Sequence, residues 1–428
     1  MIGNSYHMKR SARIALRRLG SMLQKRPAAG GESCKQDFIF ILWQNWKSYI
    51  ISPRDIYSTQ GQNTLRKGTN EMKRIGLLTS GGDCQALNAA MRGVVKGLSE
   101  NADELEVYGF LNGYKGLIYG NYKLLTSADF SGILTKGGTI LGSSRQPFKL
   151  MRVPDENGLD KVEAMKQNYY KLNLDCLVIL GGNGTQKTAN LLREEGLNVV
   201  HLPKTIDNDI YGTDVTFGFQ SAINIACDAI DCIHTTAASH NRVFIVEVMG
   251  HKVGWLTLYA GMASGADIIL LPEIPYDIDK VIEAIDKRTK AGKGFTILAV
   301  AEGAISKKDA QLSKKEYKKK LENYKYPSVS YEIADMIQEK TGIEVRVTVP
   351  GHTQRGGSPC AYDRVLCTRL GAEGARAIMD GDYGVMIAMV NGKIKRVPLG
   401  DVAGKLKVVD PESQIIKQAK YVGISFGD

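Results

Sequence analysis

The segment 203–209 (PKTIDND) places two carboxylates and a lysine close together, directly after the apolar run 197–202. If this segment is extended, Asp207 and Asp209 lie on one face about 7 Å apart, because side chains repeat every two residues. One carboxylate can then hold a metal ion while the other accepts a proton, which separates the roles of two neighbouring anions. The alternative is an Asp-rich turn held by local hydrogen bonds. The spacing alone leaves both interpretations open.

Apolar runs that end in glycine turns recur after residue 72 and predict the scaffold for this segment. The runs are 75–78, 174–180, 243–248 and 295–301, and the first two lead into helical stretches. Continuous apolar strands of this kind indicate parallel strands that are covered on both faces. The sequence therefore predicts a doubly wound α/β fold, in which ligands bind beyond the carboxyl ends of the strands.

Two of the glycine turns, at 81–82 and 181–184, could bind phosphate, because glycine lets backbone N–H groups approach phosphate oxygens at the start of a helix. Neither matches the Walker or the dinucleotide-binding pattern, so either turn alone is equally explained as a tight turn without a ligand. Arginines add a second signal, because the guanidinium fork suits phosphate monoesters. A single arginine is more often part of a surface ion pair, but the four near glycine-bounded strand ends favour a phosphorylated substrate: Arg145, Arg242, Arg346 and Arg355.

The net charge of +11 does not predict a nucleic-acid-binding body. Residues 1–71 carry 12 Lys/Arg against 4 Asp/Glu, which leaves 44 against 41 for the rest of the chain. A sharp core starts at Met72, so we expect 1–71 to be a disordered tail or the product of a mis-assigned start codon, with a transit peptide as the alternative. The lysine-rich segment 306–325 is typical of a solvated helix or loop.

The other bulk features predict a cytoplasmic protein that is not inserted in a membrane. The apolar run 38–43 is too short to span a bilayer of about 30 Å. The seven cysteines form no CxxC pair and several lie in apolar runs, which favours reduced, buried thiols.

Five motifs, in this order and spacing, resemble the 6-phosphofructokinase family over residues 72–428. They are TSGGD at 79–83, GTILGSSR at 138–145, TIDND at 205–209, EVMG at 247–250 and GHTQRGGSP at 351–359. The C-terminal sequence VGISFGD and Lys204 are most similar to the branch whose members use either ATP or pyrophosphate.

The resemblance implies two three-layer α/β/α domains with the active site in the cleft between them. The phosphoryl-donor domain would comprise 72–218 and about 354–404, and the sugar-phosphate domain 219–353 and about 405–428. The reaction would be phosphoryl transfer to the 1-hydroxyl of fructose 6-phosphate with Mg²⁺. The enzyme would be a homodimer or homotetramer, because in the family Arg242 and Arg346 reach the active site of a neighbouring subunit.

The resemblance also implies roles for individual residues. Asp207 would be the base, Asp209 and Asn183 would serve the metal site, and Arg145 would neutralise charge on the transferring group, as expected for phosphoryl transfer. The donor would be bound by Gly82, Arg145, Gln146, Gly182, Asn183, Gly184 and Thr185. The sugar phosphate would be bound by Thr205, Asp207, Arg242, Met249, Gly250, His251, Glu302, Arg346, His352 and Arg355.

Several positions depart from the family pattern. Asn183 replaces an aspartate of the short ATP-using forms, and an amide oxygen is a weaker ligand for a hard cation. His251 replaces an arginine, which leaves its role at the sugar open. The effector site of regulated bacterial forms keeps basic residues only in part, so we do not expect their regulation here: Arg92, Lys96 and Lys293 remain, whereas Ser127, His234, Asp267 and Ala291 differ.

Two residues associated with the choice of phosphoryl donor indicate different donors. Gly184 is associated with ATP, because a side chain there would occupy the space of the α-phosphate, whereas Lys204 is associated with pyrophosphate. A lysine is flexible and can move aside, so we predict ATP as the donor. The alternatives are a reversible pyrophosphate-dependent phosphotransferase and a catalytically silent nucleotide-binding subunit, against which the intact Asp207, Asp209 and Arg145 argue.

Overall fold

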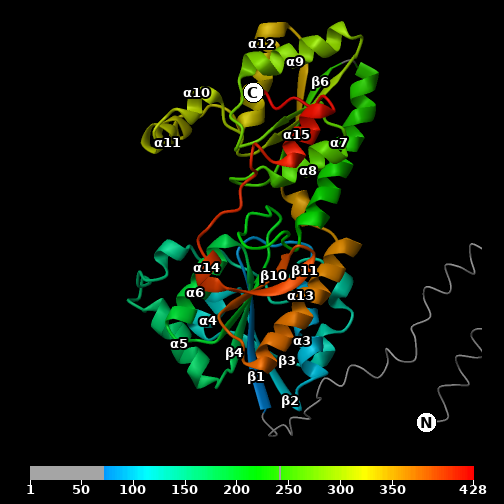
Figure 1. The fold of residues 1–428 in the computed structure, drawn as a ribbon. Coiled ribbons are helices and arrows are strands. Elements are labelled where there is room, and N and C mark those ends of the chain that lie inside the picture. Colours follow the sequence, from blue (N-terminus) through cyan, green and yellow to red (C-terminus); the bar gives the residue numbers. More distant parts are fainter. Residues whose placement is uncertain (1–71, 241) are drawn as a thin grey trace, which may run out of the picture. The chain divides into compact units, whose positions relative to one another are not determined.

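The computed structural model describes residues 72–240 and 242–428, which form an α/β fold with two mainly parallel sheets (Figure 1). The larger sheet has the order β11-β10-β5-β4-β1-β2-β3, in which only the edge strands β3 and β11 are antiparallel to their neighbours. The smaller sheet, β7-β8-β6-β9, is parallel throughout. The strands are β1 (Met72–Ser80), β2 (Glu104–Phe110), β3 (Tyr122–Leu125), β4 (Cys176–Gly181), β5 (Val199–Pro203), β6 (Val243–Val248), β7 (Ile268–Leu270), β8 (Thr296–Ala301), β9 (Val345–Thr348), β10 (Val385–Val390) and β11 (Lys393–Pro398).

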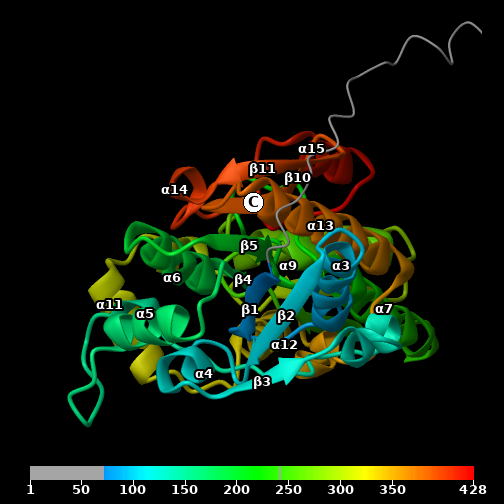
Figure 2. The same cartoon turned by 90° about the horizontal axis from the view of Figure 1, so that it is seen from below.

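The larger sheet is buried on both faces. In β4, Val178 and Leu180 pack into one hydrophobic cluster and Leu177 and Ile179 into another, because successive side chains point to opposite faces of a sheet. Figure 2 shows the first face covered by α3 (Leu87–Ser99) and α13 (Ala361–Asp380), and the second by α4 (Tyr114–Tyr119), α5 (Lys161–Lys171) and α6 (Asn183–Glu194).

The smaller sheet is covered in the same way, which confirms the predicted three-layer α/β/α class. In β8, Ala299 packs with the cluster of α7 (Phe219–His240) and α8 (Trp255–Ala263), whereas Leu298 packs with α9 (Ile278–Lys290) and α12 (Val329–Thr341). Shorter helices complete the described chain: η1 (Ser127–Phe130), η2 (Ile133–Thr135), η3 (Phe148–Leu150), α10 (Lys307–Ala310), α11 (Lys314–Glu322), η4 (Gly351–Arg355), α14 (Leu399–Val402) and α15 (Gln414–Tyr421).

The structure confirms the prediction for the lysine-rich segment and part of the prediction for the cysteines. The lysine-rich segment forms α10 and α11, neither of which buries a residue, as predicted for a solvated helix. Cys84, Cys176 and Cys367 are buried free thiols, whereas Cys232 is exposed, contrary to the expectation of burial. Within the described residues no helix is both long and apolar enough to cross a bilayer. The predictions for 1–71 concern residues outside the part of the chain that the structure describes.

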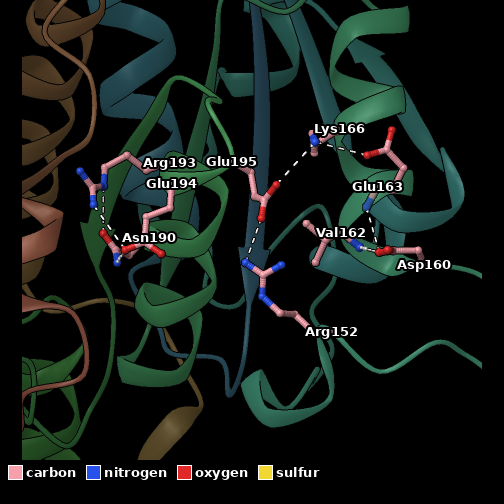
Figure 3. Close-up of polar contacts among 9 residues, drawn as sticks. All are labelled: Arg152, Asp160, Val162, Glu163, Lys166, Asn190, Arg193, Glu194 and Glu195. Atoms are coloured by element: carbon pink, nitrogen blue, oxygen red, sulfur yellow. Dashed lines mark hydrogen bonds and ion pairs between the residues drawn. The ribbon is translucent and has the colours of Figure 1, made fainter.

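An ion-pair network fixes the end of α6, the helix whose first turn carries Asn183 and Gly184 (Figure 3). Glu195 accepts a hydrogen bond from Arg152 Nη2 at 2.8 Å, and its other carboxylate oxygen lies 3.5 Å from Lys166 Nζ. The hydrogen bond from Arg152 lowers the pKa of Glu195. Lys166 belongs to α5, so the contacts join two helices on the same face of the sheet.

Helices α3 and α13 approach each other through glycine. A Cβ added at Gly93 would lie 2.8 Å from the carbonyl oxygen of Cys367, and one at Gly371 would lie 2.6 Å from backbone atoms of Gly93 and Val94. Backbone atoms cannot move aside as a side chain does, so the glycines allow the close approach. At Gly374, one turn further along α13, the nearest atom would be at 3.6 Å, an ordinary contact.

This difference predicts opposite effects of two alanine substitutions in one helix. Gly371→Ala should lower the free energy of unfolding by about 1–3 kcal/mol, because it overpacks the helix contact. Gly374→Ala should leave it unchanged or raise it by about 0.5–1 kcal/mol, because alanine is the better helix former. Urea unfolding of both variants checks the pair. Equal stability of the two would contradict the close approach of the helices.

Candidate active site

A cleft of about 810 Å³ gathers the predicted site residues from the ends of strands in both sheets. Only Arg242, Gly250 and Arg346 do not line it, and Gly250 lies between two lining residues. Gly81, from the predicted phosphate-binding turn at 81–82, also lines it. The lining further includes residues to which the sequence assigned no role: Ser80, Pro147, Phe148, Lys187, Lys252, Gly404 and Leu406.

Residues 205–209, which we call the catalytic turn after the role predicted for Asp207, follow β5 as a bent segment. The chain bends at Ile206 and Asp207, and Asn208 has a φ of 55°. The segment is therefore not extended, and the expectation that Asp207 and Asp209 lie on one face of a strand is wrong. Asparagine suits this position, because it tolerates the left-handed region better than most residues.

Local hydrogen bonds fix the catalytic turn. The hydroxyl of Thr205 accepts a bond from the N–H of Asp207 at 3.0 Å, and the Thr205 carbonyl accepts one from the Thr216 hydroxyl at 2.8 Å. The N–H of Thr216 also donates to Asn208 Oδ1 at 3.0 Å. These bonds hold both carboxylates at the cleft, which Asp207 and Asp209 line.

The surroundings of Asp209 disfavour its negative charge. Burial, and after it the negative charge of Asp207, raises the pKa of Asp209 to about 6. A nearby cation stabilises a buried carboxylate of this kind, because it offsets the free-energy cost of the negative charge. The position of Asp209 therefore suits a metal ligand.

Asn183 also fits the predicted magnesium site. Asn183 lines the cleft, and its amide Nδ2 donates a hydrogen bond to the carbonyl of Lys405 at 2.9 Å. Its Oδ1 therefore remains as the acceptor for a metal ion. The described residues contain no preformed cluster of three or more His, Cys, Asp or Glu side chains for a metal. A Mg²⁺ site with few protein ligands is completed by water and donor phosphates, and Asp209 and Asn183 provide oxygen ligands of the kind it uses.

Hydrogen bonds join the loop that carries Arg145 to the end of β1. The Gly81 N–H donates to the carbonyl of Ser144 at 3.1 Å, and the Ser143 hydroxyl donates to the carbonyl of Gly81 at 2.6 Å. Gly81 has a φ of 86°, which allows this tight turn. The pairing brings Arg145 and Gln146 to the cleft beside Gly82.

The opposite side of the cleft is built on the ends of β6 and β8. The carboxylate of Glu302 accepts hydrogen bonds from the N–H groups of Gly250 at 3.3 Å and His251 at 2.6 Å. The buried Gln354 accepts a bond from the Met249 N–H at 3.3 Å, and Arg355 Nη1 donates to the carbonyl of Asp83 at 2.8 Å. Gln354 belongs to the motif at 351–359, but the sequence alone does not indicate its bond to Met249.

The sequence matches the family described as Phosphofructokinase over residues 74–378. The chain belongs to the phosphofructokinase family. It is 54% identical over 363 residues to the ATP-dependent 6-phosphofructokinase of Spirochaeta thermophila, covering 83% of this chain and 98% of that protein. It is 47% identical over 355 residues to ATP-dependent 6-phosphofructokinase 3 of Bacteroides thetaiotaomicron, covering 83% of this chain and 100% of that one.

Solved phosphofructokinases share the fold. The enzyme from Saccharomyces cerevisiae superposes with a TM-score of 0.67 at 32% identity, over 77% of this chain and 45% of that longer chain. A pyrophosphate-dependent phosphofructokinase from Marinobacter aquaeolei superposes with a TM-score of 0.67 at 22% identity, over 83% of this chain and 92% of that one. The latter similarity concerns the fold alone.

Gly184 and Lys204, the two residues associated with the choice of donor, have different surroundings. A Cβ added at Gly184 would meet no atom within 4 Å, so the position opens into the cleft. Lys204 is only 2% exposed, and its ammonium donates to the carbonyl of Gly82. Burial lowers the pKa of Lys204. The expectation that Lys204 can freely move aside is therefore wrong, because its side chain is enclosed and bonded beneath the glycine turn.

Arg242 and Arg346 lie away from the other predicted site residues. Both pair with Glu344: Arg242 Nε is 2.6 Å from Glu344 Oε2, and Arg346 contacts Oε1. Among the changed effector positions, Asp267 pairs with Arg288 at 2.7 Å, and His234 contacts the carbonyl of Ser264 at 2.6 Å. The expectation that the regulation of bacterial forms is absent here stays a prediction.

The raised pKa of Asp209 predicts a pH-dependent gain in stability when its charge is removed. Because the folded pKa of about 6 exceeds the ordinary value of 3.8, its stabilising contribution is complete below about pH 3.8 and is lost as pH rises through about 6. Metal-free Asp209→Asn should therefore exceed the wild type in unfolding free energy by about 1–3 kcal/mol at pH 7.5, and by less at pH 4.5.

Urea unfolding in the presence of a chelator measures this difference. Asp155→Asn is the matched control, because hydrogen bonding from Leu159 lowers the pKa of Asp155 instead. It should not gain stability at pH 7.5. An Asp209→Asn variant no more stable than the wild type at pH 7.5 would show that the charge of Asp209 is not costly in the fold.

Proposed function

We propose that this protein transfers the γ-phosphoryl group of ATP to the 1-hydroxyl of fructose 6-phosphate, giving fructose 1,6-bisphosphate and ADP, the committed step of glycolysis. The observation that carries the proposal is the match over 98–100% of two relatives, both of which are named ATP-dependent 6-phosphofructokinases. The open space at Gly184, in the cleft with both carboxylates of the catalytic turn, supports ATP as the donor.

In this proposal Asp207 accepts the proton of the 1-hydroxyl, whose oxygen attacks the γ-phosphorus while the bond to the leaving ADP breaks. Arg145 neutralises charge that develops on the transferring group, and most of the rate enhancement comes from positioning and charge stabilisation. Bound Mg²⁺ would neutralise charge on the donor phosphates, held by Asp209 and Asn183.

Separate sides of the cleft would bind the two substrates. On the donor side lie Gly82, Arg145, Gln146, Gly182, Asn183, Gly184 and Thr185. On the sugar-phosphate side we assign Thr205, Met249, Gly250, His251, Glu302, His352 and Arg355. Five of these seven residues fall within the predicted sugar-phosphate domain, whereas Thr205 and Arg355 fall within the predicted limits of the donor domain, so both domains would contribute to the sugar-phosphate side.

Arg242 and Arg346 would act in the active site of a neighbouring subunit. Their distance from the other predicted residues supports this assignment, because in their own chain they pair with Glu344 outside the cleft. We therefore propose a homodimer or homotetramer with shared active sites. As a glycolytic enzyme the protein would act in the cytoplasm.

Pyrophosphate-dependent transfer is the second candidate, and Lys204 favours it. The buried ammonium of Lys204 lies next to the glycine turn at 81–82, where it could attract a small anionic donor. Its bond to the Gly82 carbonyl engages it with the protein, which reduces that attraction. The silent-subunit alternative is disfavoured, because Asp207, Asp209 and Arg145 all line one cleft.

A coupled assay with fructose 6-phosphate and Mg²⁺, in which ATP or pyrophosphate is offered separately, tests the proposal on the wild type and Gly184→Asp. The wild type should turn over with ATP. In Gly184→Asp, kcat/KM for ATP should fall by roughly 100-fold or more, because the carboxylate occupies and repels the space of a donor phosphate.

Gly184→Ala is the control, and its kcat/KM for ATP should fall by less, because a methyl group is small and carries no charge. Neither variant should unfold more easily, since no protein atom is displaced and an acidic residue in the first turn suits a helix N-terminus. Absence of turnover with ATP in the wild type would overturn the proposed donor. ATP kinetics equal in wild type and Gly184→Asp would refute the steric argument.

A further inference from the structure

A C-terminal segment that no motif covers runs along the catalytic turn. Gly404 and Leu406 line the cleft, and Leu406 forms an antiparallel bridge with Ile210. The N–H of Lys407 donates to the carbonyl of Asp209 at 2.9 Å. The backbone of Asp209 is thus held by a residue almost two hundred positions further along the chain.

The side chain of Lys407 binds the same turn a second time. Its ammonium donates to Asn208 Oδ1 at 2.9 Å, to the carbonyl of Thr213 at 3.0 Å and to the carbonyl of Asp214 at 2.8 Å. An ammonium has three protons, so these acceptors use all of them. Lys407 is therefore engaged with the protein and does not offer a free charge to a ligand.

Asn208 is the residue at which such support matters most. It stands between the two carboxylates with a φ of 55°, a conformation that costs free energy in a residue other than glycine. Its Oδ1 has two lone pairs, and it accepts from both Thr216 N–H and Lys407. Without the Lys407 ammonium, Asn208 Oδ1 keeps only the hydrogen bond from the Thr216 N–H.

Lys407 is itself anchored to elements beside the smaller sheet. The indole N–H of Trp255, at the start of α8, donates to the Lys407 carbonyl at 3.0 Å, and the ammonium lies 5.5 Å from the centre of the indole ring. Two residues on, the N–H of Val409 donates to Glu273 Oε1 at 2.9 Å. The segment thereby connects the catalytic turn with α8.

We propose that Lys407 is a positioning residue, which acts through the Asn208 side chain and the Asp209 backbone to hold Asp207 and Asp209 in their reactive orientation. The proposal rests on the proposed function for its kinetic consequence. It does not place Lys407 in contact with either substrate. Loss of its ammonium should therefore affect turnover more than substrate binding.

The test compares Lys407→Met with the wild-type enzyme. Turnover should fall by roughly 10- to 100-fold, because small displacements of reacting groups are costly, while KM for both substrates changes by less than roughly threefold. Lys420→Met is the matched control: Lys420 also lies over an aromatic ring, that of Phe426, but it pairs with Asp428 and not with the catalytic turn. Its turnover should equal that of the wild type.

A readout independent of activity separates this proposal from the proposed function. Hydrogen exchange of the backbone amides of 207–210 should accelerate in Lys407→Met and not in Lys420→Met, whatever the reaction catalysed. Lys407→Gln keeps two N–H donors on a shorter side chain and should be intermediate in turnover and exchange, and it serves if the methionine variant does not fold. Unchanged exchange at the turn, or normal turnover in a variant that only melts earlier, would overturn the proposal.

Discussion

Two carboxylates must be held two residues apart at the edge of a cleft that binds negatively charged phosphates. Burial disfavours the charge of Asp209, and the nearby negative charge of Asp207 adds to this cost, so the pKa of Asp209 is raised. The chain accommodates them by bending at Asp207 and by placing Asn208 in the left-handed region. Both carboxylates line the cleft in this bent conformation.

The rest of the fold supports this turn from several directions. β5 delivers it at the carboxyl edge of a parallel sheet, where β1 and β4 also deliver their glycine turns. Thr216 bonds to it from the following loop, and Lys407 from the C-terminal segment. Arg145 and Arg355 line the same cleft and provide the positive charge that our proposal assigns to the phosphates.

Much of this site could be predicted from the sequence, because its residues stand in short motifs directly after apolar strands. The position of Gly184 in the first turn of α6 and that of Arg145 after a glycine-rich loop are local properties. What local sequence could not indicate depends on contacts between distant segments. The clearest cases are the left-handed Asn208 with its partner Lys407, and the burial of Lys204 against the Gly82 carbonyl.

The location of Arg242 and Arg346 is the other property that sequence pattern alone does not reveal. Both share Glu344 outside the cleft, and nothing in the local pattern distinguishes them from Arg355, which lines it. The assignment of Arg242 and Arg346 to a neighbouring subunit comes from the family resemblance. The four arginines by themselves would favour a single phosphate site within one chain.

The most direct test of the central claim is to measure, for Asp207→Ser, both turnover with ATP and the dissociation constant of fructose 6-phosphate. If Asp207 is the base, turnover should fall by several orders of magnitude, roughly 10²–10⁴-fold or more, while the sugar phosphate binds nearly as it does to the wild type. Substantial turnover, or collapse of sugar-phosphate binding, would contradict the role of Asp207 as the base.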